Sequence, residues 1–267
     1  MSSGQTAQTD PFHSRLAVAE KLARAAGERA RAFFLDRDTL HPVSKSDSQD
    51  LVSEADRAIE AWLRDAIGDV FPDDGIVGEE EAASEGSSGF VWVIDPIDGT
   101  MPFLVGQPNW TVSIGIAWHG KPVVGVIFAP VMDELYAAVE GGGARLNGRP
   151  LTINPDWTIA STTIGFGATQ KATPKEVGAF VEALYEAGGV LFRVGSGALM
   201  LAYVAANRLA GYYDPTLYCW DCWAGIVLVR EAGGVVTFDG NLATPGPMWA
   251  GNRGVHDELR RLSNVPG

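Results

Sequence analysis

The sequence predicts a mixed α and β fold (α/β in the broad sense, mixed α+β), and three observations indicate it. Two stretches near the N-terminus space their apolar residues as amphipathic helices do. The middle of the chain reads as short apolar strands joined by turns, and after Pro155 strands and helices alternate. We expect a single domain over residues 10–267, in two halves of about 10–150 and 151–267, with residues 1–9 a disordered tail.

The N-terminal part of the domain is predicted to contain two helices. Asp10 and Pro11 indicate a helix start, because aspartate caps helix N-termini and proline is tolerated at the first helical position. Apolar residues at helical spacing follow over residues 15–34. Residues 41–52 have loop-like composition, and a second amphipathic helix is expected from near Ser53 to Pro72.

The middle of the chain is predicted to form a sheet. The expected strands cover residues 75–80, 90–95, 110–118, 123–130 and 135–142. Turn sequences at 119–122 and 129–134 indicate that neighbouring strands are antiparallel, because no helix separates them. Residues 141–151 read as a glycine-rich connection. This run lacks the lysine and the spacing of a phosphate-binding P-loop.

The second half alternates between the two kinds of element. Strands are expected over residues 162–167, 190–194, 210–214 and 235–238. Helices are expected over 174–188, 196–207 and 223–234, with a short helix near 255–262.

Composition and charge exclude several functional classes. The formal net charge of −13 argues against direct nucleic-acid binding, so a phosphorylated ligand would require recruited cations. No apolar run approaches the roughly 20 residues of a membrane span. The first ten residues are polar and lack the apolar segment of a signal peptide. With only two cysteines and no disulfide framework, we expect a cytoplasmic protein without a membrane partner.

Acidic residues gather where predicted elements end. Glu79 follows one strand, Asp95 and Asp98 follow another, and Asp221 opens a helix. Mg²⁺ prefers oxygen ligands and commonly binds a few carboxylates together with water. Pro96 stiffens the turn between the two aspartates, and the Ile97 carbonyl offers a further ligand. The alternative is that Asp95 and Asp98 only cap a helix and shape a turn.

The residues after Asp98 predict phosphate binding. Gly99 and Thr100 lie at an expected helix start, where unpaired N–H groups favour anions. A rival chemistry forms an aspartyl-phosphate on the first aspartate of a D-x-D pattern. Here the spacing is D-x-x-D, which favours metal-activated water instead.

Cys219 and Cys222 form a C-x-x-C at an expected helix start, which can mark a redox pair, yet we interpret them as packing residues. The residues between them, Trp220 and Asp221, belong to the acidic motif, and no second cysteine or histidine pair completes a zinc site.

Three motifs carry a resemblance to a known family. `GEE` at 78–80, `WVIDPIDGT` at 92–100 and `WDCWAG` at 220–225, in this order and at these separations, resemble the inositol monophosphatase family. `KSDSQDLVSEAD` at 45–56 and `GSGALMLAYVAAN` at 195–207 also match. The resemblance implies the layered αβαβα sandwich that this family shares with fructose-1,6-bisphosphatase. It also implies a Mg²⁺-dependent, lithium-sensitive phosphatase.

The resemblance implies two or three Mg²⁺ ions. Glu79, Asp95 and the Ile97 carbonyl would hold the first ion. Asp95, Asp98 and Asp221 would hold the second, and a third, weaker ion would lie near Glu79.

The catalytic residues implied are Thr100 and Asp56, which would orient the attacking water, and Lys45, which would offset negative charge near the metals. Asp56 could instead be an ordinary helix cap. Asp50 also matches the family, and we interpret it as structural.

Substrate contacts are implied for one further set of residues: Asp98, Gly99, Thr100, Ser196, Gly197 and Asp214. The chain departs from the commonest family pattern at Met101-Pro102, in `GQPNW` at 106–110, and at Asp214, where a glutamate is common. We therefore expect a small phosphorylated metabolite, with myo-inositol monophosphate first and L-histidinol phosphate second. 3′-Phosphoadenosine-5′-phosphate and fructose 1,6-bisphosphate are alternative substrates that we rank below these two.

The resemblance also implies a homodimer. Some bacterial members act as transcription-associated partners, so a non-catalytic scaffold stays the alternative from a different class.

Overall fold

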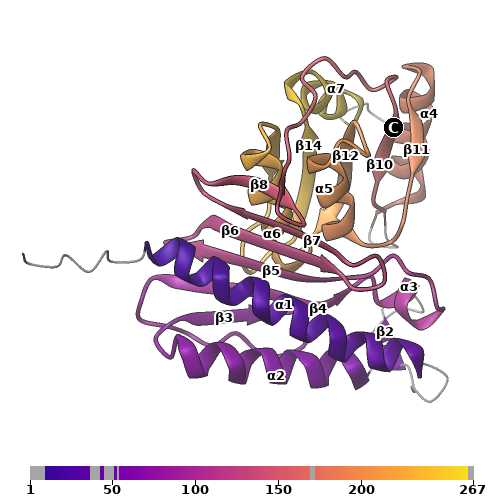
Figure 1. Ribbon diagram of the computed structural model, residues 1–267. Helices are drawn as coiled ribbons and strands as arrows, with labels where there is room; N and C mark the ends of the chain where they lie inside the picture. The colour runs from indigo at the N-terminus through magenta and orange to yellow at the C-terminus, as the bar shows by residue number, and fades with distance from the viewer. Residues whose placement is uncertain (1–9, 37–42, 45–50, 53, 169–171, 264–267) are drawn as a thin grey trace, which may run out of the picture.

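The computed structural model describes residues 10–36, 43–44, 51–52, 54–168 and 172–263, which stack in five layers (Figure 1). Helices α1 (Pro11–Leu35) and α2 (Glu54–Val70) cover one face of a seven-stranded sheet. Helices α5 (Gly197–Ala205) and α6 (Cys219–Glu231) lie between this sheet and a five-stranded one. Helices α4 (Pro174–Glu186) and α7 (Arg253–Ser263) cover the outer face of the second sheet. The αβαβα sandwich is thus confirmed.

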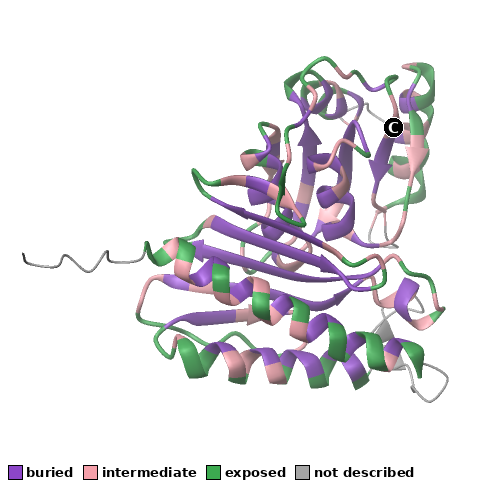
Figure 2. Cartoon of the chain, in the orientation of Figure 1, coloured by how far each residue is buried: buried purple, intermediate pink, exposed green. Residues whose placement is uncertain are grey.

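Helix α1 begins where the sequence predicted. The Asp10 carboxylate accepts a hydrogen bond from the Phe12 N–H at 2.9 Å, and Pro11 occupies the first turn. One side of the helix is fully buried and the opposite side is exposed (Figure 2). The buried side carries small residues, so the helix packs closely on the sheet: Ala19, Ala23, Ala26 and Ala30.

The seven-stranded sheet has the order β3-β4-β5-β6-β7-β8-β9. Its strands are β3 (Gly75–Gly78), β4 (Phe90–Asp98), β5 (Thr111–Trp118), β6 (Lys121–Ala129), β7 (Glu134–Val139), β8 (Gly143–Leu146) and β9 (Arg149–Pro150). Strands β4 to β7 are antiparallel to their neighbours, as predicted. The pairs β7-β8 and β8-β9 are antiparallel as well. The prediction was wrong for β3 and β4, which are parallel, because residues 79–89 return the chain to the end of the sheet where β3 begins.

Strands β8 and β9 lie where the sequence indicated only a glycine-rich connection. Asn147 and Gly148 both have positive φ, 48° and 78°, which is the backbone of a two-residue hairpin turn. The glycines and the asparagine therefore allow the turn and do not prevent the strands around it.

The five-stranded sheet has the order β11-β10-β12-β14-β13. Its strands are β10 (Thr163–Phe166), β11 (Val190–Phe192), β12 (Gly211–Leu217), β13 (Val235–Phe238) and β14 (Gly246–Gly251). Strand β14 was not predicted. Its sequence, `GPMWAG`, is poor in β-branched residues, and its pairing between β12 and β13 holds it in the sheet.

Helices α5 and α6 form the central layer, and most of their residues are buried. Figure 2 maps burial over the whole chain. Apolar residues make up nearly every side of both helices. A helix of this kind is stable only when it is buried all round. At Gly125 of β6, a Cβ would lie 2.1 Å from the Ala224 carbonyl oxygen of α6. Glycine is thus required there for α6 to approach the sheet. Within the described part of the chain, no helix is both long and apolar enough to cross a membrane.

Candidate active site

A β-bulge brings Asp95 and Asp98 together at the end of β4. In a regular strand, residues three apart point to opposite faces of the sheet. Here Asp95 pairs with Ser113 and Asp98 with Thr111, so two residues of β4 stand opposite one residue of β5. The extra residue reverses the alternation, and both carboxylates reach the same site.

Asp221 completes a cluster of three carboxylates. It lies in the first turn of α6, where one of its oxygens accepts a hydrogen bond from the Tyr218 N–H at 3.0 Å. Asp95, Asp98 and Asp221 each offer one oxygen, and these three atoms all lie within 4.8 Å of one another. The α6 N-terminus is placed by burial of the helix between the sheets, so the fold itself assembles this cluster.

The cluster carries more negative charge than its surroundings neutralise. Burial, followed by repulsion from Glu79 and Asp98, raises the pKa of Asp95 well above its usual value. Burial together with Asp98 and Glu79 has the same effect on the pKa of Asp221. Among the described residues that line the adjoining pocket, Arg193 is the only base. An all-oxygen donor set of this charge fits a hard divalent cation such as Mg²⁺.

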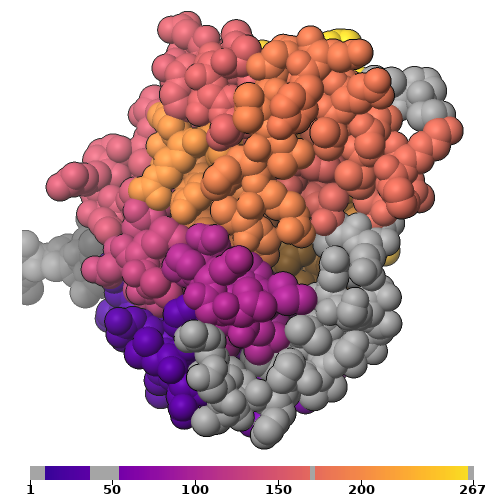
Figure 3. All heavy atoms as spheres, turned by 90° about the vertical axis from the view of Figure 1, so that its right-hand side faces the viewer, coloured from indigo at the N-terminus to yellow at the C-terminus, as the bar shows by residue number. Residues whose placement is uncertain are grey.

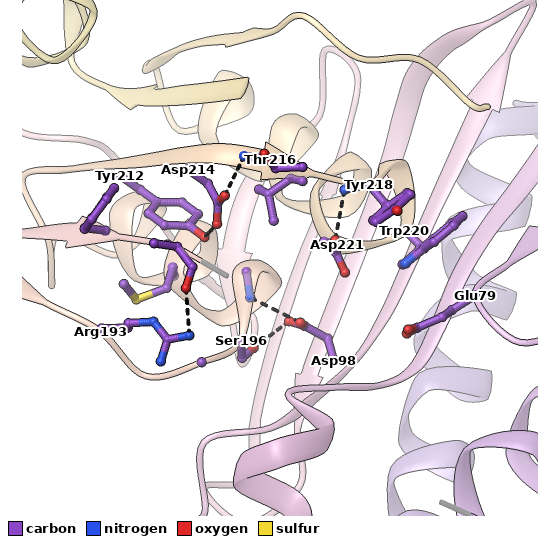
Figure 4. A pocket seen from close by; sticks show the side chains of 17 residues that line it. Glu79, Asp98, Arg193, Ser196, Tyr212, Asp214, Thr216, Tyr218, Trp220 and Asp221 are labelled. Carbon is purple, nitrogen blue, oxygen red and sulfur yellow. Dashed lines mark hydrogen bonds between the residues drawn. The ribbon is translucent and has the colours of Figure 1, made fainter. Parts of the chain in front are cut away.

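Glu79 directly follows β3 and faces the same space as Asp98 and Asp221 (Figure 4). The Ile97 carbonyl oxygen lies 3.4 Å from the Thr100 Oγ1 atom. The Ile97 N–H donates a hydrogen bond to the Asp95 Oδ1 atom at 3.0 Å. The structure therefore brings together the four carboxylates expected to hold metal, and it places the Ile97 carbonyl beside Thr100.

Thr100 and Asp56 also lie side by side. The Thr100 Oγ1 atom is 3.4 Å from the Asp56 Oδ2 atom, although the two residues are 44 positions apart. Asp56 is buried in the first turn of α2. Thr100 is the first residue of α3 (Thr100–Leu104), preceded by Gly99 with a φ of 100°. A side chain at position 99 would be strained, and its Cβ would lie 2.9 Å from the Asn109 carbonyl oxygen.

A pocket of about 180 Å³ extends from the carboxylate cluster into the second half of the chain. Figure 3 views the face on which the α3 segment meets this second half, and the surface between them recedes to deeper atoms. The pocket walls include aromatic rings, glycines and polar groups, among them Phe166, Gly167, Arg193, Ser196, Tyr212, Asp214, Tyr218 and Trp220.

Ser196 and Gly197 line the pocket and also hydrogen-bond to Asp98, a contact that the sequence did not predict. Both donate to Asp98: the Ser196 Oγ atom at 2.5 Å and the Gly197 N–H at 3.1 Å (Figure 4). The Ala198 N–H donates to the same carboxylate at 2.8 Å. Asp98 thus caps helix α5 from 99 residues away. The N-cap serine followed by a glycine and a helix was the available signal, but it does not identify the partner.

Asp214 lies at the far end of the pocket. The Tyr212 hydroxyl donates to its Oδ2 atom and the Thr216 N–H to its Oδ1 atom, both at 2.8 Å. Burial raises the pKa of Asp214 to about 6. Opposite it, a Cβ on Gly167 would lie 1.7 Å from the Asp214 Oδ2 atom, so a glycine is required there.

Lys45 and Asp50 lie outside the described residues. Both cysteines are buried, and burial raises the pKa of the Cys219 thiol to about 12 and that of Cys222 well above its usual value. Such thiols are poor nucleophiles, which favours the interpretation as packing residues.

Comparison with known proteins agrees with this geometry. The model of the inositol monophosphatase family matches residues 13–260. The chain belongs to the inositol monophosphatase family. It is 38% identical to the Nus factor SuhB of Haemophilus influenzae, over 83% of this chain and 84% of that protein. It is 37% identical to the inositol-1-monophosphatase of Mesorhizobium japonicum, over 95% of this chain and 98% of that protein.

Solved structures of family members share the fold. The suhB protein of Bartonella henselae superimposes with a TM-score of 0.89 at 31% identity, covering 95% of this chain and all of that one (100%). The inositol monophosphatase of Anabaena gives a TM-score of 0.82 at 32% identity, covering 95% and 96% of the two chains.

Proposed function

We propose that the protein hydrolyses a small phosphate monoester with the help of Mg²⁺. The observation that carries this proposal is the convergence of Asp95, Asp98 and Asp221 at one end of a pocket large enough for a small metabolite. The family membership supports it.

Two sets of ligands would hold the ions. Glu79, Asp95 and the Ile97 carbonyl would bind one, and Asp95, Asp98 and Asp221 the other, with a third, weaker ion near Glu79. Bound Mg²⁺ would supply Lewis-acid stabilisation of the phosphate and activation of water. The Asp98 Oδ2 atom already accepts hydrogen bonds from Ser196, Ala198 and Thr111. The Asp98 Oδ1 atom accepts only the Gly197 N–H and so retains a lone pair for a metal.

The residues of the chain would orient the reactants. Thr100 would donate its hydroxyl proton to Asp56, so that its lone pairs accept a hydrogen bond from the attacking water. The backbone N–H groups of Gly99 and Thr100 would contact the phosphate oxygens. Lys45 would offset negative charge near the metals.

The substrate we propose first is myo-inositol monophosphate. Asp214 would accept hydrogen bonds from ring hydroxyls, and the pocket edge at Ser196 and Gly197 would contact the ring. L-Histidinol phosphate is the second choice, because the stacked rings of Tyr218 and Trp220 line the same pocket and would suit an imidazole. We also propose that Li⁺ inhibits the phosphatase activity and that the protein forms a homodimer.

A transcription-associated role is the second candidate function. The observation that favours it is the name Nus factor SuhB, carried by relatives that are 38 or 39% identical to this chain.

A phosphate-release panel separates these candidates. It would contain inositol 1-phosphate, histidinol phosphate, 3′-phosphoadenosine-5′-phosphate and fructose 1,6-bisphosphate, each with and without Mg²⁺ and with added Li⁺. We expect Mg²⁺-dependent release that is greatest for inositol 1-phosphate and suppressed by Li⁺. No release from any of the four would favour the non-catalytic role.

A further inference from the structure

Glu60 is a fully buried carboxylate whose partners lie next to Glu79. Its Oε2 atom accepts the Glu80 N–H at 2.8 Å, and its Oε1 atom accepts the Glu81 N–H at 3.0 Å. These are charge-assisted bonds, about twice as strong as those between neutral groups. Both anchor points are backbone atoms, so they fix the course of the chain immediately after Glu79.

Two neighbouring residues support the contacts of the Glu60 carboxylate with the Glu80 and Glu81 N–H groups. Arg64, one turn further along α2, donates from Nε to the Glu60 Oε1 atom at 2.9 Å and from Nη2 to the Glu81 carbonyl at 3.1 Å. On the strand side, a Cβ on Gly78 would lie 2.3 Å from the Glu60 Oε1 atom. The glycine before Glu79 therefore leaves the space that the carboxylate occupies.

Helix α2 connects this contact to a second part of the candidate site. Asp56 and Glu60 are four residues apart and lie on the same face of α2. Asp56 contacts Thr100, while Glu60 holds the segment that carries Glu79. Helix α2 therefore fixes the position of Asp56, which is expected to orient water, relative to the segment that carries Glu79, which is expected to bind metal.

We propose that Glu60 is a positioning residue for Glu79, and that its contacts with the Glu80 and Glu81 N–H groups set the Mg²⁺ affinity of the site. The inference rests on the proposed function, in which Glu79 is a metal ligand. Mg²⁺ requires near-ideal octahedral geometry at about 2.1 Å, so a small displacement of one ligand weakens binding.

A purely structural role explains these contacts less well. Replacing a buried ion pair with apolar residues of similar volume is often neutral or stabilising, so stability alone does not account for Glu60 and Arg64. What a carboxylate does provide is two acceptors at a fixed separation, which match two successive N–H groups.

The test is Glu60→Gln. The amide retains the shape of the side chain but turns one acceptor into a donor that faces a backbone N–H, so the segment must move. The Mg²⁺ dependence of the melting temperature reports binding without turnover. We expect the apparent Kd for Mg²⁺ to rise about 10-fold, the lower end of the range for residues that orient metal ligands. Excess Mg²⁺ should restore kcat.

Two further variants make the result decisive. Glu134→Gln is the matched control, because Glu134 also binds an arginine, Arg208, through two bonds at 2.6 and 2.7 Å but does not line the pocket. It should leave the Mg²⁺ affinity unchanged. Should Glu60→Gln fail to fold, Gly78→Ala displaces the same carboxylate and should show the same weakening.

The outcomes separate this inference from the proposed function on which it rests. If Glu79→Gln weakens Mg²⁺ binding while Glu60→Gln leaves it at the wild-type value, the positioning role is wrong and the metal assignment stands. Wild-type Mg²⁺ binding in Glu79→Gln would overturn both.

Discussion

Arg15 and Asp74 form a buried, two-point ion pair between the first helix and the turn before β3. The Arg15 Nε and Nη2 atoms lie 2.7 and 2.8 Å from the two carboxylate oxygens. The same carboxylate accepts the Ser88 hydroxyl at 2.6 Å and the Trp92 indole N–H at 2.8 Å. Asp74 therefore joins α1, the loop before β4 and β4 itself at one point.

Replacing Asp74 with asparagine should destabilise the protein strongly. It leaves the Arg15 guanidinium buried and unpaired, which costs about 3–5 kcal/mol in comparable pairs. Urea denaturation measures this loss. Asp133→Asn is the control, because the Asp133 pair with Arg24 is exposed and long, at 3.4 Å, and such pairs contribute at most about 1 kcal/mol.

The Asp74 effect should also depend on pH. Burial alone would raise the pKa of Asp74, but hydrogen bonds from Arg15, Ser88 and Trp92 hold it below the usual value of 3.8. Its contribution is therefore complete above that value and is lost as pH falls through the lower, folded-state pKa. The difference in unfolding free energy between wild type and Asp74→Asn should shrink below pH 3.8. An unchanged difference in acid would contradict this assignment.

The contribution of Asp214 to stability should change with pH in the opposite direction to that of Asp74. Burial raises its pKa from 3.8 to about 6, so between these values the folded protein binds a proton that the unfolded chain does not. Stability from this group is present below pH 3.8 and is lost as pH rises towards 6. The melting temperature of wild type relative to Asp214→Asn should fall across that window. A difference that stays constant with pH would show that Asp214 is not so perturbed.

Adding a methyl group at Gly167 should impair substrate use and spare metal binding. The Cβ would meet the Asp214 Oδ2 atom at 1.7 Å and would narrow the far end of the pocket, away from the carboxylate cluster. We expect Gly167→Ala to lower kcat/KM about 10-fold or more through misplaced substrate, with an unchanged Mg²⁺ half-saturation.

Gly178→Ala is the matched control for that variant. Gly178 is exposed on α4, and its Cβ would meet nothing within 4 Å. Kinetics should be unaffected and stability should rise by roughly 0.5–1 kcal/mol. Equal kinetic losses in both variants would contradict a local effect at Asp214.

Local patterns predicted the helices and the acidic motifs well, because capping residues, periodicity and the D-x-x-D spacing are short-range signals. The parallel pairing of β3 with β4 was not predictable in this way, since it depends on the path of residues 79–89. The contact of Asp98 with the α5 N-terminus and that of Glu60 with the Glu80 N–H join distant segments. Such contacts follow from the stacking of layers, which leaves no local pattern.

The measurement that tests the central claim most directly compares wild type with Asp221→Asn. Mg²⁺ binding is followed by calorimetry and phosphate release from inositol 1-phosphate is followed in the same preparations. Asp221 contributes to the carboxylate cluster and is half-buried in the first turn of α6, and asparagine there removes the charge with little change in volume.

We expect the wild type to bind Mg²⁺ and to release phosphate only when Mg²⁺ is present. The variant should fold, bind Mg²⁺ more weakly and lose more than about 100-fold in turnover, beyond the loss typical for residues that only orient a ligand. Turnover near the wild-type rate in a folded Asp221→Asn variant would contradict metal-assisted hydrolysis at this cluster.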